Sequence, residues 1–144
     1  MLNRPLIKAS FPVKTEQEMT ALGASLASCL KAPKVIALYG TLGAGKTTFV
    51  RGFIRSLLKE DVPSPTFTLL QTYTTPLGDI YHFDFYRLKS PEEALELNIE
   101  EAFATGICFL EWPEKIGKFL PKKQVSITFE TVRTERLVTI EGLS

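Results

Sequence analysis

One stretch of nine residues combines glycines, a lysine and threonines at the spacing G-x-x-x-x-G-K-[ST], which is typical of loops that bind nucleotide phosphates. The stretch consists of Gly40, Thr41, Leu42, Gly43, Ala44, Gly45, Lys46, Thr47 and Thr48. Glycines let the backbone come close to an anion and turn its N–H groups toward it. The pattern assigns Lys46 to the β- and γ-phosphates and the hydroxyl of Thr47 to Mg²⁺, and Thr48 could contact an inner phosphate.

The segments on either side of this loop are the ones that a phosphate loop requires. Residues 35–39 form an apolar run that predicts a buried strand. After the loop, apolar residues recur at helical spacing and predict a helix that ends near Lys59; they are Phe49, Val50, Phe53, Ile54, Leu57 and Leu58. Such a helix would point the positive end of its dipole at the anion. These flanks disfavour the alternative, a chance match in an ordinary strand-to-helix turn.

Two acidic residues are each predicted at the end of an apolar strand, where nucleotide-binding α/β domains have their sites. Glu111 follows the apolar residues 107–110 and is the best candidate for an acid that holds Mg²⁺ directly or through water. The alternative for Glu111 is a helix cap or a salt bridge. Asp84 lies in the strand predicted over 80–85, with His82 on the same face. A lone histidine is usually structural.

Two further segments could contribute to such a site. Thr66 lies in Ser64-Pro65-Thr66-Phe67, after the predicted phosphate-loop helix. In nucleoside triphosphatases a threonine-bearing loop at this place can become ordered around Mg²⁺ and the γ-phosphate. The alternative is a proline-stiffened connector whose hydroxyls cap a turn. Trp112 directly follows Glu111 and could pack beside the site or shield it from water.

The remaining patterns predict the elements that position these residues. Thr15 and Glu18 form a capping box for a helix, and Ser90, Pro91 and Glu93 mark a second helix start. Strands are expected over 6–11, 67–74 and 80–85, and a closing hairpin over 125–131 and 136–141. We therefore predict an α/β fold of the three-layer P-loop NTPase type in a single domain over residues 1–144. It should have a mostly parallel central sheet flanked by helices and a C-terminal β-hairpin.

The bulk composition is that of an ordinary globular protein, with 44% hydrophobic and 23% charged residues in 144. A net charge of +1 gives no strong footprint for direct nucleic-acid binding. Cys29 and Cys108 lie in apolar stretches without metal or redox spacing, so we expect two buried free thiols in a reducing compartment. Neither a signal peptide nor a membrane-spanning run is evident, which favours a cytoplasmic location without membrane contact.

Four motifs in this order resemble the TsaE (YjeE) family of small bacterial ATPases, which serve the biosynthesis of threonylcarbamoyladenosine in tRNA. The motifs are the phosphate loop, Ser64-Pro65-Thr66-Phe67, His82-x-Asp84-x-Tyr86-Arg87 and Glu111-Trp112-Pro113. A phosphate loop alone is shared by very many proteins, whereas the four motifs together are specific and span most of the chain. The resemblance implies ATP and Mg²⁺ as cofactors and the TsaD and TsaB proteins as partners, with tRNA met only indirectly through their complex.

The resemblance also implies roles for individual residues. Lys46 would bind phosphates, and Thr47 and Glu111 would hold Mg²⁺. Asp84 would be an essential acid near the metal and the attacking water, Thr66 part of a switch-like segment, and Trp112 an important neighbour of Glu111. Glu16 and Arg136 would lie near the adenine, between the N-terminal segment and the C-terminal hairpin. Whether Asp84 or Glu111 orients the attacking water stays open, because a metal ligand and a water-positioning carboxylate look alike in sequence.

Two other functions are compatible with a phosphate loop. A small P-loop kinase would need an acceptor site and usually an arginine-rich lid, and no such insertion is visible in the sequence. An adaptor could use ATP only to shape a binding surface, without hydrolysis. We expect slow hydrolysis by the isolated protein, because no obvious arginine finger is present and a partner would complete the site.

Overall fold

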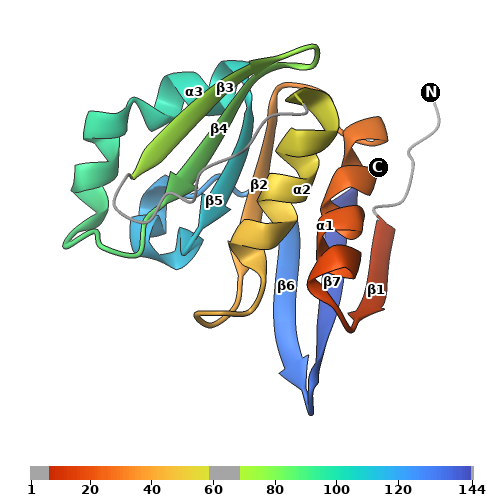
Figure 1. Ribbon diagram of the computed structural model, residues 1–144. Helices are drawn as coiled ribbons and strands as arrows, with labels where there is room; N and C mark the ends of the chain where they lie inside the picture. Colours follow the sequence, from red (N-terminus) through yellow and green to blue (C-terminus); the bar gives the residue numbers. More distant parts are fainter. Residues whose placement is uncertain (1–6, 59–68, 144) are drawn as a thin grey trace.

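The computed structural model describes residues 7–58 and 69–143, which form a mixed α/β fold around a single sheet (Figure 1). The strands are β1 (Ile7–Val13), β2 (Lys34–Tyr39), β3 (Leu70–Thr75), β4 (Gly78–Asp84), β5 (Ile107–Glu111), β6 (Val125–Val132) and β7 (Glu135–Leu143). The α-helices are α1 (Glu16–Ser25), α2 (Lys46–Leu58) and α3 (Ile99–Thr105), and the 3₁₀ helices are η1 (Leu26–Ser28), η2 (Pro91–Leu97) and η3 (Pro113–Phe119).

The described strands form a seven-stranded sheet in the order β1-β7-β6-β2-β5-β4-β3. Its centre is parallel, because β2 pairs in parallel with both β5 and β6, and β4 pairs in parallel with β5. Both edges are antiparallel, through β1 with β7, β6 with β7, and β3 with β4. The parallel pairing predicted for the centre of the sheet is confirmed, but three of the six described strand pairs are antiparallel. The pairs β3–β4 and β6–β7 are hairpins, which require antiparallel pairing, whereas β1 and β7 come from opposite ends of the chain.

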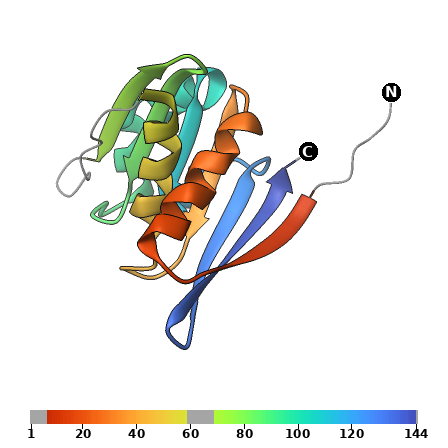
Figure 2. The same ribbon diagram turned by 45° about the vertical axis from the view of Figure 1, so that its right-hand side comes forward.

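Helices cover both faces of the sheet, as predicted for three layers. Helices α1 and α2 lie on one face, and α3 lies on the other with η2 and η3 (Figures 1 and 2). Strand β5 shows why both faces must be covered, since all five of its residues are buried. Ile107 and Phe109 pack on the α1–α2 side, whereas Cys108 and Leu110 pack on the α3 side. A parallel strand buried on both faces is a continuous apolar run rather than an alternating one.

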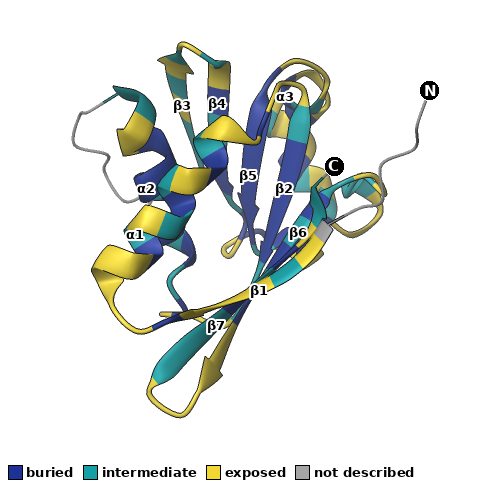
Figure 3. Ribbon diagram, turned by 90° about the vertical axis from the view of Figure 1, so that its right-hand side faces the viewer, coloured by how far each residue is buried: buried dark blue, intermediate teal, exposed yellow. Residues whose placement is uncertain are grey.

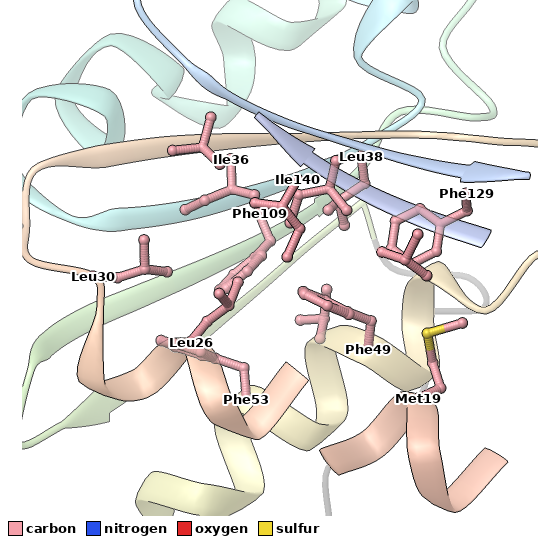
Figure 4. Packing of buried hydrophobic residues seen from close by; sticks show 14 of the residues in the cluster. Met19, Leu26, Leu30, Ile36, Leu38, Phe49, Phe53, Phe109, Phe129 and Ile140 are labelled. Carbon is pink, nitrogen blue, oxygen red and sulfur yellow. The ribbon is translucent and has the colours of Figure 1, made fainter. Parts of the chain in front are cut away.

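The larger core lies between the sheet and the α1–α2 pair (Figure 4). Phe53 of α2 meets Phe109 of β5 with ring centroids 4.9 Å apart, and Phe49 meets Phe129 of β6 at 5.5 Å, both edge-to-face. These rings are almost completely buried, and removing a buried phenylalanine ring typically costs about 3–5 kcal/mol of stability. The core thus fixes the helix that follows the glycine-rich loop against the strand that precedes Glu111.

The predicted N-cap residues are confirmed at two helices, but of the two predicted capping boxes only the one at Ser90 is complete, because Glu18 accepts from the residue before the cap. The Thr15 hydroxyl accepts from the Glu18 N–H at 3.1 Å, and the Glu18 carboxylate accepts from the Lys14 N–H at 3.4 Å. At Ser90 the predicted capping box is present, with proline at the first helical position. These bonds satisfy N–H groups that have no partner within the helix itself.

The predicted C-terminal hairpin is confirmed as β6 and β7, and β1 runs beside β7 at the sheet edge (Figure 2). Strands β2 and β5 are buried, whereas the tip of the hairpin is exposed (Figure 3). Cys108 is buried as predicted, but Cys29 is exposed because it follows η1, beyond the buried stripe of α1. In the part of the chain that the structure describes, no helix is both long and apolar enough to cross a membrane.

Helices α1 and α2 approach each other closely at two glycines. A Cβ atom on Gly52 would collide with the backbone carbonyl of Thr20, and one on Gly23 with that of Phe49. We expect Gly52→Ala to lower the free energy of unfolding by about 1–3 kcal/mol through overpacking, although alanine is the better helix former. Chemical denaturation measures this, with Ser56→Ala on the exposed side of α2 as control. A stabilised Gly52→Ala protein would contradict the close packing.

Candidate functional site

Three structural features meet at the carboxyl ends of the parallel strands. Strand β2 ends at Tyr39 and leads into the glycine-rich loop, β4 ends at Asp84, and β5 ends at Glu111. The three strands run parallel, and Asp84 and Glu111 lie side by side in register. The carboxyl ends of parallel strands are where open α/β sheets bind ligands. The structure therefore brings together the two acids and the loop, as the sequence analysis expected.

The glycine-rich loop has the backbone geometry that only glycine adopts easily. Gly43 and Gly45 have φ values of 76° and 102°. A Cβ on Gly45 would also lie 2.7 Å from the Met19 side chain of α1. Helix α2 begins at Lys46, so the loop opens directly onto a helix N-terminus. This combination of inward-curving backbone and helix dipole makes an anion cradle.

Lys46 is only 4% exposed although it carries a charged group. Its ammonium donates to the Gly40 carbonyl at 2.7 Å and lies 3.9 Å from the centre of the Trp112 ring. Burial lowers the pKa of Lys46, while the nearby carboxylates Glu111, Glu114 and Asp84 oppose that shift. The lysine therefore rests on a carbonyl and an aromatic face, both weak partners that an anionic group would outcompete.

Thr47 and Glu111 are in direct contact. The Thr47 hydroxyl lies 3.1 and 3.0 Å from the two carboxylate oxygens of Glu111 and donates to them. Glu111 is buried, and its Oε2 also lies 2.6 Å from Nε2 of the fully buried His82. Burial raises the pKa of Glu111, but the hydrogen bond and charge of His82, the Thr47 hydroxyl and Lys46 together hold it below its usual value. Glu111 is thus kept ionised in a buried place.

Asp84 has a different environment. One of its oxygens accepts from the Tyr86 N–H at 3.0 Å. Burial raises the pKa of Asp84 most strongly, the Tyr86 hydrogen bond opposes this, and the Glu111 charge adds to the rise. The pKa values of the two neighbouring carboxylates are therefore shifted in opposite directions, which is common where two acids have different roles.

Trp112 links these groups. It adopts the left-handed conformation, with φ 59° and ψ 51°, directly after Glu111. Its ring covers Lys46 and lies 4.9 Å from the ring of Tyr86, measured between centroids. A bulky residue is uncommon at positive φ, and such strain is often found at functional sites. The predicted place of Trp112 beside the site agrees with this geometry.

A cavity of about 250 Å³ opens on the other side of the loop. The cavity is lined by the two residues that were expected near the adenine, Glu16 at the start of α1 and Arg136 on β7. Gly45 and Thr48 of the loop also line it. Arg136 also donates to the Gly43 carbonyl at 3.2 Å. Pairing of Val13 with Arg136 across β1 and β7 brings these distant parts of the chain together.

One residue of the site, His82, was not predicted from the sequence, and one predicted residue, Thr66, is not tested by the structure. His82 was expected to be structural, yet it contacts Glu111. The available signal was its position two residues before Asp84, which puts both side chains on one face of β4. Thr66 and the segment 64–67 lie outside the described residues, so their predicted switch role remains a prediction.

The fold and this site define a mixed α/β protein with an anion cradle and two carboxylates at the ends of its parallel strands. A sequence model of the family described as threonylcarbamoyl adenosine biosynthesis protein TsaE matches residues 13–138. The tRNA threonylcarbamoyladenosine biosynthesis protein TsaE of Rickettsia bellii is 40% identical over 126 residues, which covers 86% of this chain and 88% of the relative. The protein of the same name from Bacillus subtilis is 36% identical over 116 residues, covering 79% and 72%.

A solved structure agrees with these relatives. The crystal structure of Bacillus subtilis YdiB matches the fold with a TM-score of 0.79 at 28% identity, covering 99% of this chain and 90% of that one. The chain belongs to the TsaE family of threonylcarbamoyl adenosine biosynthesis proteins. The resemblance inferred from four short motifs is thereby confirmed.

The Asp84 carboxylate is expected to lower the free energy of unfolding at neutral pH. Its pKa is raised in the folded state, so the folded protein binds this proton more tightly, and stability is lost as the pH rises through that pKa. We expect Asp84→Asn to raise the free energy of unfolding by about 0.5–2 kcal/mol at pH 7. The gain should vanish below the ordinary aspartate pKa of 3.8. Thermal melting at both pH values measures it, and the exposed Asp79→Asn should show no gain. A loss of stability at pH 7 would contradict the assignment.

Proposed function

We propose that this chain is a P-loop, Mg²⁺-dependent ATPase that acts on the TsaD–TsaB threonylcarbamoyl-transfer complex during tRNA modification in the cytoplasm. The observation that carries the proposal is the direct contact between Thr47 at the end of the loop and Glu111 at the end of β5. A loop hydroxyl joined to a strand-end carboxylate is the pair that P-loop enzymes use to hold Mg²⁺. Family membership supports the pathway.

The residues present fit both ATP and Mg²⁺. The positive φ values of Gly43 and Gly45 give the loop a backbone conformation that suits phosphate, and Lys46 supplies a positive charge at the same place. Thr47 and Glu111 offer hard oxygen ligands, which Mg²⁺ prefers. Both Glu111 oxygens accept from the Thr47 hydroxyl, and Oε2 also contacts His82, which favours holding the ion through water over direct coordination. The cavity beside Glu16 and Arg136 is our proposed place for the adenosine part.

The mechanism that we derive assigns positioning and charge stabilisation to the chain's own residues. The loop N–H groups and Lys46 bind the phosphates, which requires the ammonium to leave the Gly40 carbonyl. Thr47 and Glu111 would hold Mg²⁺, which when bound neutralises charge on the β- and γ-phosphates. Glu111 is occupied by two partners, whereas the second oxygen of Asp84 accepts no hydrogen bond from the described residues. We therefore assign the orientation of the attacking water to Asp84.

The proposal is tested by measuring ATP turnover of the purified chain alone and with TsaD and TsaB. We expect slow turnover alone and a clear increase with the partners, because the sequence shows no obvious arginine finger and a partner would then complete the site. Phosphate release that is absent in both conditions would overturn the hydrolase assignment. Fast turnover by the isolated chain would overturn the partner dependence, and transfer to a small acceptor would show a kinase instead.

A further inference from the structure

His82 is a buried histidine with a hydrogen-bond partner at only one of its two ring nitrogens among the described residues. It is fully buried on β4, paired in register with Phe109 of β5. Its Nε2 lies 2.6 Å from Oε2 of Glu111, and its Nδ1 is buried without a hydrogen-bond partner among the described residues. A buried imidazole normally satisfies both nitrogens, because an unpaired polar atom costs stability. Within the described chain, Glu111 is thus the hydrogen-bond partner that offsets the burial of this ring.

The direction of the hydrogen bond follows from its partner. An ionised carboxylate has lone pairs and no proton, so Nε2 of His82 must donate. Oε2 receives this bond in addition to the one from Thr47, whereas Oε1 receives only the Thr47 hydroxyl. The single hydroxyl hydrogen of Thr47 is shared between both oxygens and cannot by itself fix the carboxylate. His82 supplies the second, independent point of attachment that stops rotation of the group.

We propose that His82 is a positioning residue that holds the Glu111 carboxylate, through its Nε2–H, in the orientation that serves Thr47 and the magnesium site. Ligand groups at metal sites are commonly oriented by such outer partners, whose loss costs about 10–100-fold in metal affinity or activity. The inference rests on the proposed ATPase function. It goes beyond that function because it gives a role to a residue that the proposed mechanism does not use.

The chain offers a matched pair of variants. Glutamine and methionine have the same length and unbranched shape, but only glutamine carries an N–H donor at the reach of Nε2. We expect His82→Met to raise the Mg²⁺ concentration for half-maximal ATP binding by about 10–100-fold, with Mg²⁺-free nucleotide binding unchanged. His82→Gln should restore most of the wild-type value. Circular dichroism confirms folding, and Phe109→Leu controls for loss of core packing beside the ring.

Two outcomes would overturn the proposal. One is that His82→Gln and His82→Met need the same Mg²⁺ concentration for half-maximal ATP binding, whether both values equal that of the wild type or both are raised. The other comes from the unmutated protein: His82 is the only histidine of the chain, so its ring gives a single set of ¹⁵N signals. We expect the proton on Nε2 and a shift of that signal in Glu111→Gln. A proton on Nδ1 alone, or no response to Glu111→Gln, would contradict the contact.

The two measurements separate this inference from the proposed function. The NMR experiment needs no nucleotide and tests the contact alone. If the wild-type chain binds no Mg²⁺–ATP, the proposed ATPase fails while the tautomer is still determined. If the wild type binds and the matched variants do not differ, the ATPase stands and the positioning role fails.

Discussion

Glu111→Gln is expected to reduce partner-stimulated ATP turnover about 10²–10³-fold, comparable to losing one charge-stabilising group in an active site. Glutamine keeps the size of the side chain and can still accept from Thr47, but it lacks the negative charge that attracts a cation. Because glutamine has the same shape and places no charge at this buried position, the neutral variant should fold. Mg²⁺-free ATP binding should persist through the loop and Lys46, whereas the Mg²⁺ concentration for half-maximal ATP binding should rise, as it does when Glu111 loses its positioning partner.

The measurement is steady-state phosphate release with TsaD and TsaB present, accompanied by direct nucleotide binding. Glu100→Gln is the matched control, since it removes the same charge from an exposed side chain on α3. Turnover near the wild-type value in Glu111→Gln would remove the residue from the catalytic machinery. It would also favour an adaptor that needs ATP only to shape a surface, provided that tRNA modification is preserved.

Lys46→Met is expected to weaken ATP binding about 10²–10³-fold, on the scale of losing a preorganised charge-stabilising contact. The ammonium is almost fully buried, and its contacts to the Gly40 carbonyl and the Trp112 ring do not compensate like a carboxylate would. Methionine fills the same space without that desolvation cost. The ligand-free variant should therefore be at least as stable as the wild type, while losing the ligand.

Thermal melting with and without Mg²⁺–ATP measures both effects together. The wild type should gain stability from the nucleotide by mass action, and Lys46→Met should not at the same concentration. Lys115→Met, an exposed lysine near the same edge, should keep the full response. An unchanged nucleotide-induced shift in Lys46→Met would show that ATP binds elsewhere.

The Lys46 prediction reflects a property shared by several groups of this site, which is that they lower the stability of the ligand-free protein. A buried lysine, a carboxylate with raised pKa and a tryptophan at positive φ lie within one constellation. Each lowers stability in the absence of a ligand, and together they are satisfied by a charged one. The two buried hydrophobic cores of the fold offset this loss of stability.

Local signals in the sequence were enough for much of this description. Capping at Thr15 and Ser90, the strand ending at Glu111 and the glycine-rich loop depend on neighbouring residues, so short patterns predict them. That both acids lie at one sheet edge followed from the general geometry of parallel strands. These are the parts of the site that chain order alone determines.

The rest depended on which strands become neighbours, which no local pattern encodes. The antiparallel pairing of β1 with β7 joins distant parts of the chain and places Val13 opposite Arg136, whose side chain contacts the loop. The His82–Glu111 contact depends on the register between β4 and β5. Cys29 was wrongly expected to be buried because an apolar neighbourhood in sequence does not fix the direction of a side chain after a helix ends.

The central claim is that ATP hydrolysis at the Thr47–Glu111 site drives the chain's part in tRNA modification. The most direct test is reconstituted formation of threonylcarbamoyladenosine in tRNA, with TsaD, TsaB and a preformed threonylcarbamoyl donor, so that the nucleotide serves this chain alone. We predict repeated modification cycles with ATP and an early stop with a non-hydrolysable analogue or with Glu111→Gln. Equal multiple-turnover modification with ATP and with the analogue would contradict the account.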